Sequence, residues 1–186
     1  MAYLTNKQLL EFQPKQSPQQ INEMLAKAAP KYGTDGSIGL KGARVFISHS
    51  HYDTALIKKA KLYLLSQGAS IYVDLEDTFM PDETSPDTGR ILKTKIDGCD
   101  KFIMLASTNA LNSKWVPWEL GYADKAIGID NVAIFPVADD TGRWKGSEYM
   151  GLYPEIQMSL NEQRTFSASV MGPSADVWLT NWLQRK

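Results

Sequence analysis

The sequence predicts an α/β fold in which a parallel β-sheet is covered by helices on both faces. Four short runs of β-branched and aromatic residues alternate with segments of helical periodicity. Each run is continuously apolar, which is typical of strands that are buried on both faces. The chain has 186 residues, of which 43% are hydrophobic, and this is enough for one domain of that kind. Together these observations favour an open, flavodoxin-like sheet.

The individual elements follow from these runs and from the capping residues between them. The runs predict strands at residues 45–47, 71–73, 102–105 and 132–135. Serines that precede apolar stripes predict three helices, with starts at Ser50, Ser85 and Ser113 and ends at Gly68, Gly98 and Gly128. Residues 152–156 are a candidate fifth strand at the sheet edge, where Pro154 is tolerated. Trp178 and Trp182 lie four apart within residues 174–185, which predicts a closing helix with both indoles in the core.

Residues 1–43 differ in character from the rest of the chain. Ser17 and Pro18 predict the start of an amphipathic helix that runs to about Ala29. A spacing typical of a linker then follows, with a glycine at every third position: Gly33, Gly36, Gly39 and Gly42. We therefore expect a helical extension and linker over residues 1–43 and the folded domain over residues 44–186.

Composition excludes several classes of protein. The 20 Lys and Arg residues balance 21 Asp and Glu residues, so no basic surface is expected for nucleic acid or for an anionic membrane. Cys99 is the single cysteine and the chain has two histidines, so neither a disulfide nor a metal site is expected. The first residues lack a signal-peptide pattern, and no apolar stretch approaches the roughly 20 residues of a membrane span. These features predict a cytoplasmic protein.

Three loops follow strands and reach the carboxyl edge of the sheet, where ligands of open parallel sheets bind. The first loop offers hydroxyl and imidazole groups for a phosphate or a ribose, on Ser48, His49 and Ser50. The second loop carries a carboxylate and two apolar side chains, on Asp74, Phe79 and Met80. Structural roles also fit these residues: helix capping for Ser50, which has capping-box spacing with Asp53, loop capping for Asp74, and packing for the apolar pair.

The third loop, residues 107–109, leads into a helix that carries Trp115 and Glu119. The two residues are four apart and therefore share one face of the helix. Pro117 is tolerated because it lies in the first turn. A carboxylate at this position lies near the ligand edge, beside an indole that excludes water. The pattern alone also fits a structural arrangement, in which Glu119 complements the helix dipole and Trp115 belongs to the core.

Taken in order, these motifs resemble a TIR (Toll/interleukin-1 receptor) domain over about residues 44–137. They are the Val45–Ser50 run, Asp74 at the end of the second strand, the long loop before the second helix and Trp115-x-x-x-Glu119. Residues 113–121 are especially similar to bacterial TIR proteins. The resemblance implies a flavodoxin-like fold with five parallel strands, with residues 44–186 as the TIR-like domain. It also implies cleavage of NAD+, bound as substrate with no cofactor, and Glu119 as the catalytic residue.

For bacterial members of the Thoeris anti-phage type, the resemblance further implies a hydrolysed or cyclic ADP-ribose product, homotypic TIR–TIR association and a downstream effector that senses the product. It places NAD+ beside Ser48, His49, Ser50, Asp74, Phe79, Met80 and Trp115. The sequence departs from enzymatic members at His49 and His51, where those members often carry arginines.

One carboxylate is chemically sufficient for this reaction. Nicotinamide is a cationic pyridinium in NAD+ and leaves as a neutral molecule, so no second acid is needed to protonate it. Glu119 could then stabilise the oxocarbenium-like ribose. Two alternatives remain open: a non-enzymatic scaffold that signals by TIR–TIR association, and an enzyme like the nucleoside deoxyribosyltransferases, which share the fold type and a catalytic glutamate.

Overall fold

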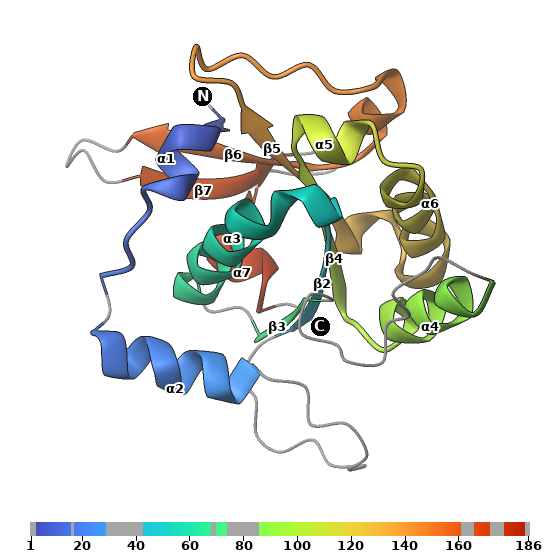
Figure 1. Ribbon diagram of the computed structural model, residues 1–186, viewed down its shortest axis with the longest axis horizontal. Helices are drawn as coiled ribbons and strands as arrows, with labels where there is room; N and C mark the ends of the chain where they lie inside the picture. The colour runs from blue at the N-terminus through green and yellow to red at the C-terminus, as the bar shows by residue number, and fades with distance from the viewer. Residues whose placement is uncertain are drawn as a thin grey trace.

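A computed structural model describes residues 3–15, 17–28, 43–67, 70–73, 86–160, 166–171 and 177–184. Within these ranges one eight-stranded sheet forms the centre of the molecule, with helices on both faces (Figure 1). Five of its parallel strands are β2 (Arg44–Ser48), β3 (Ser70–Val73), β4 (Lys101–Ala106), β5 (Val132–Ala138) and β6 (Glu155–Leu160). They lie side by side in the order β3-β2-β4-β5-β6, which is the flavodoxin-like order. The predicted α/β class and all four predicted strands are confirmed.

The sheet extends beyond the five parallel strands. β7 (Phe166–Met171) pairs antiparallel with β6, and β8 (Val177–Trp178) pairs antiparallel with β7. A fifth strand is therefore present as β6, but it begins at Glu155 and not at the predicted residue 152, which lies in a 3-10 turn. The prediction that it is an edge strand was wrong, because β7 covers its outer side. Pro154 lies one residue before β6, and its carbonyl accepts a hydrogen bond from the Ile134 amide at 2.8 Å. The proline therefore removes no donor from β6.

Three helices lie where capping residues and apolar stripes predict them: α3 (Thr54–Ser66), α4 (Pro86–Asp97) and α6 (Trp115–Ile127). Ser113 Oγ accepts hydrogen bonds from the amides of Trp115 and Val116 at 3.2 and 3.3 Å, which confirms its capping role. Gly128, at φ +82°, ends α6. A short helix, α5 (Thr108–Leu111), was not predicted, because four residues are too few to show a helical period. Single 3-10 turns, η1 (His51–Asp53), η3 (Ile129–Asn131) and η4 (Glu148–Leu152), complete the connections.

The predicted closing helix over residues 174–185 was largely wrong. Among the described residues of this range, 177–178 form β8 and Leu179–Trp182 form a helix, α7. Trp178 pairs with Ser169 of β7 and is 54% exposed, whereas Trp182 is buried as predicted. The edge of β7 offers backbone partners to the residues before α7, and this pairing prevails over the helical spacing of the two tryptophans.

The N-terminal region contains the predicted helix, α2 (Pro18–Ala28). It begins at a capping box, in which the Ser17 amide donates to Gln20 Oε1 and the Gln20 amide donates to Ser17 Oγ. The glycine-spaced linker lies outside the described residues. Two further elements belong to the sheet and its cover: β1 (Leu4–Thr5) pairs with β5, and α1 (Asn6–Leu10) packs on α3. The domain boundary at residue 43 stays a prediction, although part of the extension is integrated with the domain.

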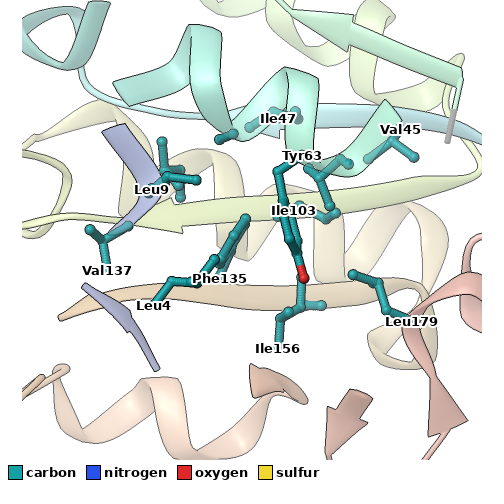
Figure 2. Packing of buried hydrophobic residues seen from close by; sticks show 14 of the residues in the cluster. Leu4, Leu9, Val45, Ile47, Tyr63, Ile103, Phe135, Val137, Ile156 and Leu179 are labelled. Carbon is teal, nitrogen blue, oxygen red and sulfur yellow. The ribbon is translucent and has the colours of Figure 1, made fainter. Parts of the chain in front are cut away.

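Each face of the sheet carries one apolar cluster, because successive strand residues point to opposite sides. Val45 and Ile47 face α1, α3 and α7, and Leu9 of α1 packs into the same cluster (Figure 2). Phe46 faces α4 and α6 and stacks on Phe102, with the ring centroids 5.6 Å apart. The helices are therefore held by apolar contacts with the sheet.

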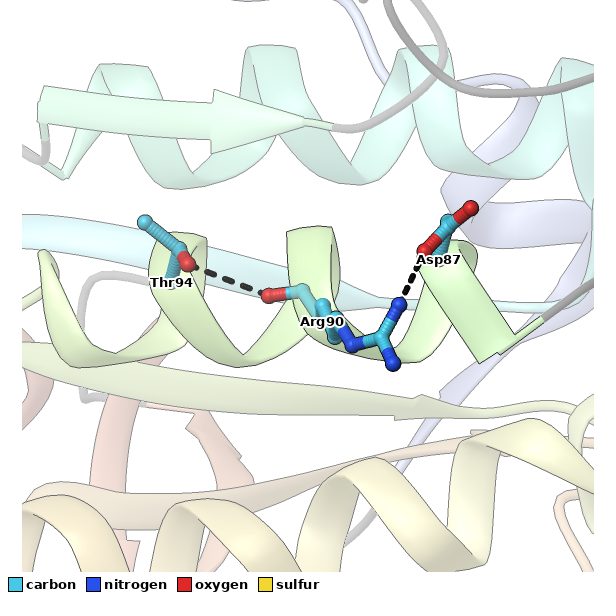
Figure 3. A network of polar contacts seen from close by, with 3 residues as sticks. All are labelled: Asp87, Arg90 and Thr94. Atoms are coloured by element: carbon cyan, nitrogen blue, oxygen red, sulfur yellow. Dashed lines mark hydrogen bonds and ion pairs between the residues drawn. The ribbon is translucent and has the colours of Figure 1, made fainter.

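The outer face of α4 is polar. Arg90 forms an ion pair with Asp87, and the Thr94 hydroxyl donates to the Arg90 carbonyl at 3.0 Å (Figure 3). Both charged side chains are more than 70% exposed, so the pair contributes little to stability. In the part of the chain that the structure describes, no helix combines the length and the apolar character needed to span a membrane.

Candidate active site

Ser48 and Glu119 meet at the carboxyl edge of the sheet. Ser48 is the last residue of β2 and is 1% exposed, and Glu119 lies in the second turn of α6 and is 7% exposed. The Ser48 hydroxyl donates a hydrogen bond to Glu119 Oε2. The residues are 71 positions apart in the sequence, so the strand–helix topology brings them together. Both belong to the site predicted from the sequence.

Glu119 occupies the buried stripe of α6, next to apolar residues. The buried residues of this helix are Val116, Glu119, Leu120 and Ala123. A carboxylate in such a stripe is costly to bury unless it receives hydrogen bonds, and packing alone would favour an apolar side chain. The helix-dipole explanation fits poorly, because that effect acts mainly within the first turn, which contains no acidic residue here. A buried, hydrogen-bonded carboxylate at the ligand edge is a typical feature of active sites.

His49 and Ser50 continue the loop after β2. The half-buried His49 ring has Nδ1 3.3 Å from the Ile47 carbonyl oxygen. Burial is the main cause that lowers the pKa of His49, which favours the neutral imidazole. Ser50 is buried and its Oγ accepts a hydrogen bond from the Tyr52 amide at 3.4 Å, so it caps η1. The imidazole and the capped turn lie beside Ser48, but their contact with a substrate stays a prediction.

Trp115 begins α6 and packs toward α4. Its half-buried ring meets the Trp118 ring edge-on, with the centroids 5.4 Å apart. The α4 backbone approaches closely, because a Cβ on Gly89 would lie 3.7 Å from the Trp115 ring. These contacts agree with the structural role that we considered for Trp115. The substrate-facing role remains a prediction, as do the roles of Asp74, Phe79 and Met80, which lie outside the described residues.

A second buried carboxylate, Asp53, was not among the predicted site residues. It is 6% exposed and accepts hydrogen bonds from the Ser107 hydroxyl and, at 2.7 Å, from Asn109 Nδ2. The capping-box interpretation is therefore corrected: Ser50 caps η1, but the Asp53 side chain turns to the loop after β4. A signal was present in the sequence, since residues 107–109 belong to the third loop at the same sheet edge.

A cavity of about 280 Å³ opens beside this carboxylate, at the carboxyl ends of β4 and β5. Asp53, Asn109 and Asp139 line it, together with Asn6 from the N-terminal region. Glu119 is not among its lining residues. Across the described ranges, no group of three or more His, Cys, Asp or Glu side chains is arranged to hold a metal ion.

The flavodoxin-like strand order and the buried glutamate at the carboxyl edge define an α/β domain of the TIR type. Residues 45–165 match the model of the TIR domain family, which is well over half of the chain. The chain therefore belongs to the TIR domain family, and the resemblance drawn from its sequence is confirmed.

Two curated relatives are similar to the chain. One is the probable 3' cyclic ADP-D-ribose synthase ThsB' of Bacillus cereus (strain MSX-D12), 40% identical over 119 residues, which cover 60% of this chain and 59% of the relative. The other is the putative cyclic ADP-D-ribose synthase TIR2 of Cytobacillus dafuensis, 33% identical over 116 residues, which cover 54% of this chain and 31% of the relative. The chain thus spans less than two thirds of either relative.

Proposed function

We propose that this protein cleaves the nicotinamide–ribose bond of NAD+ and forms ADP-ribose or a cyclic ADP-ribose signal in bacterial anti-phage defence. The observation that carries the proposal is the position of the Glu119 carboxylate. It is buried, accepts a hydrogen bond from the Ser48 hydroxyl and lies at the ligand edge of a TIR domain. The names of both relatives support a cyclic product.

The proposed chemistry needs one carboxylate in a fixed position. As the C–N bond breaks, its electron pair goes to the nicotinamide nitrogen and positive charge develops on ribose C1'. A water oxygen then bonds to C1' to give ADP-ribose, or a nucleophilic atom of the same molecule bonds to it to give a cyclic product, and a proton is released to solvent. The Glu119 carboxylate would stabilise this charge electrostatically, and the effect is strong because the group is shielded from water. The Ser48 hydroxyl holds the carboxylate in one orientation, so little reorganisation is required during the reaction.

The proposal includes the partners and the place of action. We propose that copies of the domain associate through TIR–TIR contacts, that the loop with Asp74, Phe79 and Met80 helps to complete the site, and that an effector senses the product. We place the activity in the cytoplasm, where NAD+ is available. An assay must therefore include assembled protein, for example at high concentration with a crowding agent, besides the dilute monomer.

The test replaces Glu119 by glutamine, an isosteric amide that can still accept the Ser48 hydrogen bond. Glu119→Gln should fold normally and release nicotinamide at least about 100-fold more slowly than the wild type, because the charge opposite C1' is lost. Glu148→Gln makes the same change at an exposed position of η4 and should keep full activity. Undiminished turnover in Glu119→Gln would refute the assignment.

Chromatography of the products separates the remaining alternatives. Nicotinamide with linear ADP-ribose identifies a hydrolase, and nicotinamide with a cyclic isomer identifies a signal synthase. Transfer of a deoxyribosyl group between bases, with NAD+ unchanged, would support the transferase alternative. Assembled wild-type protein that changes neither substrate would leave the non-enzymatic scaffold as the function.

A further inference from the structure

Two serine–carboxylate hydrogen bonds join the same two segments of the chain, residues 48–53 and residues 107–119, and they run in opposite directions. Ser48, at the end of β2, donates to Glu119, which follows β4 in the chain. Ser107, directly after β4, donates back to Asp53, which follows β2. Residues 48–53 therefore supply one donor and one acceptor, and residues 107–119 supply the complementary pair.

The second connection, which we call the Asp53 clasp, consists of Asp53, Ser107 and Asn109. Both carboxylate oxygens of Asp53 are used, since Oδ2 accepts from Ser107 and Oδ1 accepts from Asn109 Nδ2 at 2.7 Å. Ser107 Oγ also accepts the Ala110 amide at 3.0 Å, so the clasp includes the cap of α5. A buried carboxylate with two donors is not released easily, because losing either bond leaves one of its buried oxygens without a donor.

Local structure does not account for the Asp53 carboxylate. The residue occupies the N-cap position of α3, but its side chain makes no capping hydrogen bond there. Its two partners lie 54 and 56 positions further along the chain. The carboxylate thus connects the loop after β2 to α5, and α5 leads through the Ser113 cap directly into α6.

We propose that Asp53 is a positioning residue for the cleavage of NAD+. It holds the loop after β2 against the start of α5, and in this way it fixes Ser48 relative to Glu119. This inference rests on the proposed function and assigns no contact with substrate to Asp53. The Glu119 carboxylate keeps its orientation only while residues 48–53 and 107–119 keep their relative position, and small displacements of a catalytic group lower the rate strongly.

The central variant is Asp53→Asn, which preserves the size of the side chain and removes its charge. We expect kcat for nicotinamide release to fall on the order of 10–100-fold, with KM changed less than about threefold, because orientation in the transition state is affected more than binding. Asn109→Asp should lower kcat as well, since it places two carboxylates face to face. Combining both substitutions restores an amide–carboxylate hydrogen bond with the ends exchanged, and should regain most of the lost rate.

A matched control makes the same change at the opposite edge of the sheet. Asp97, the last residue of α4, accepts a hydrogen bond from the Tyr122 hydroxyl at 2.8 Å on the exposed surface. Asp97→Asn should leave kcat unchanged. Thermal unfolding of each variant separates a positioning role from a purely structural one. If Asp53→Asn lowers the unfolding temperature but leaves kcat per folded molecule at the wild-type value, the role of Asp53 is purely structural and the proposal is overturned.

Amide hydrogen exchange provides a readout that does not depend on activity. In Asp53→Asn, exchange should accelerate both in residues 48–53 and in residues 107–113, and unchanged exchange in both segments would overturn the inference. The two failures are distinguishable. If assembled wild type releases no nicotinamide, the proposed function fails and the positioning role for that reaction falls with it. If Glu119→Gln is inactive and Asp53→Asn is fully active, only the role of Asp53 is refuted.

Discussion

Replacing Leu9 by alanine tests whether the N-terminal residues stabilise the domain. Leu9 is completely buried in the cluster that also contains Leu56 and Tyr63, although it lies within the region that the sequence assigns to an extension. Truncation of a buried leucine costs about 2–5 kcal/mol. We expect about 3 kcal/mol, because α1 is a five-residue helix that can settle partly into the space left behind. For a chain of this length, that corresponds to a decrease of roughly 6–12 °C in Tm.

The neighbouring Leu10 is the matched control. It belongs to the same short helix but is 38% exposed, so Leu10→Ala should cost less than about 1 kcal/mol. Urea unfolding followed by tryptophan fluorescence and by circular dichroism measures both variants. If Leu9→Ala and Leu10→Ala cost the same small amount, α1 does not contribute to the core as we argue.

Three other predictions concern stability. Burial lowers the pKa of His49 below its usual 6.5, so the imidazole binds a proton more readily in the unfolded chain than in the folded one. The free energy of unfolding should therefore fall as the pH drops below about 6.5. In urea titrations from pH 7 to 5, His49→Asn should flatten this dependence. Gly121 lies within α6 and has open space around a Cβ, so Gly121→Ala should raise the free energy of unfolding by about 0.5–1 kcal/mol. Gly128 has φ +82°, so Gly128→Ala should lower the free energy of unfolding by about 1–2 kcal/mol. Changes of the opposite sign would contradict the backbone argument. Trp182→Phe removes the indole donor to the Asp130 carbonyl at 2.9 Å and should cost about 1–3 kcal/mol in the same assay, and a neutral effect would show that this bond is replaceable.

The central strands and main helices could be predicted because their signals are local. Continuous apolar runs identify buried parallel strands, and Ser113 and Gly128 mark the ends of α6 within a few residues. The elements that sequence reasoning missed are short or depend on distant partners. β1 has two residues and pairs with β5 more than 130 positions away, and β8 forms because β7 offers it an edge. No pattern within either segment specifies such pairing.

The same distinction applies to the candidate site. Ser48 and Glu119 were identified because the ends of parallel strands share one edge and because the family motif contains the glutamate. Asp53 was missed because its distance from Ser50 already fitted a capping box, a local explanation that was sufficient for the sequence. Asp53 follows β2, whereas the Ser107 hydroxyl that donates to it follows β4, and only the folded sheet brings these two residues together.

The two residues of β1 have an effect out of proportion to their number. β6 pairs with β5 at Ile134, and β1 pairs with β5 further along, at Val137 and Ala138. Without this short strand, the backbone donors and acceptors at the end of β5 would be open to extended segments of other molecules, and such open edges promote aggregation. The Tyr3 hydroxyl, directly before β1, donates a hydrogen bond to the Glu155 carboxylate at the start of β6 at 2.6 Å. Residues 3–5 thus protect the backbone at the end of β5 and connect it to the start of β6.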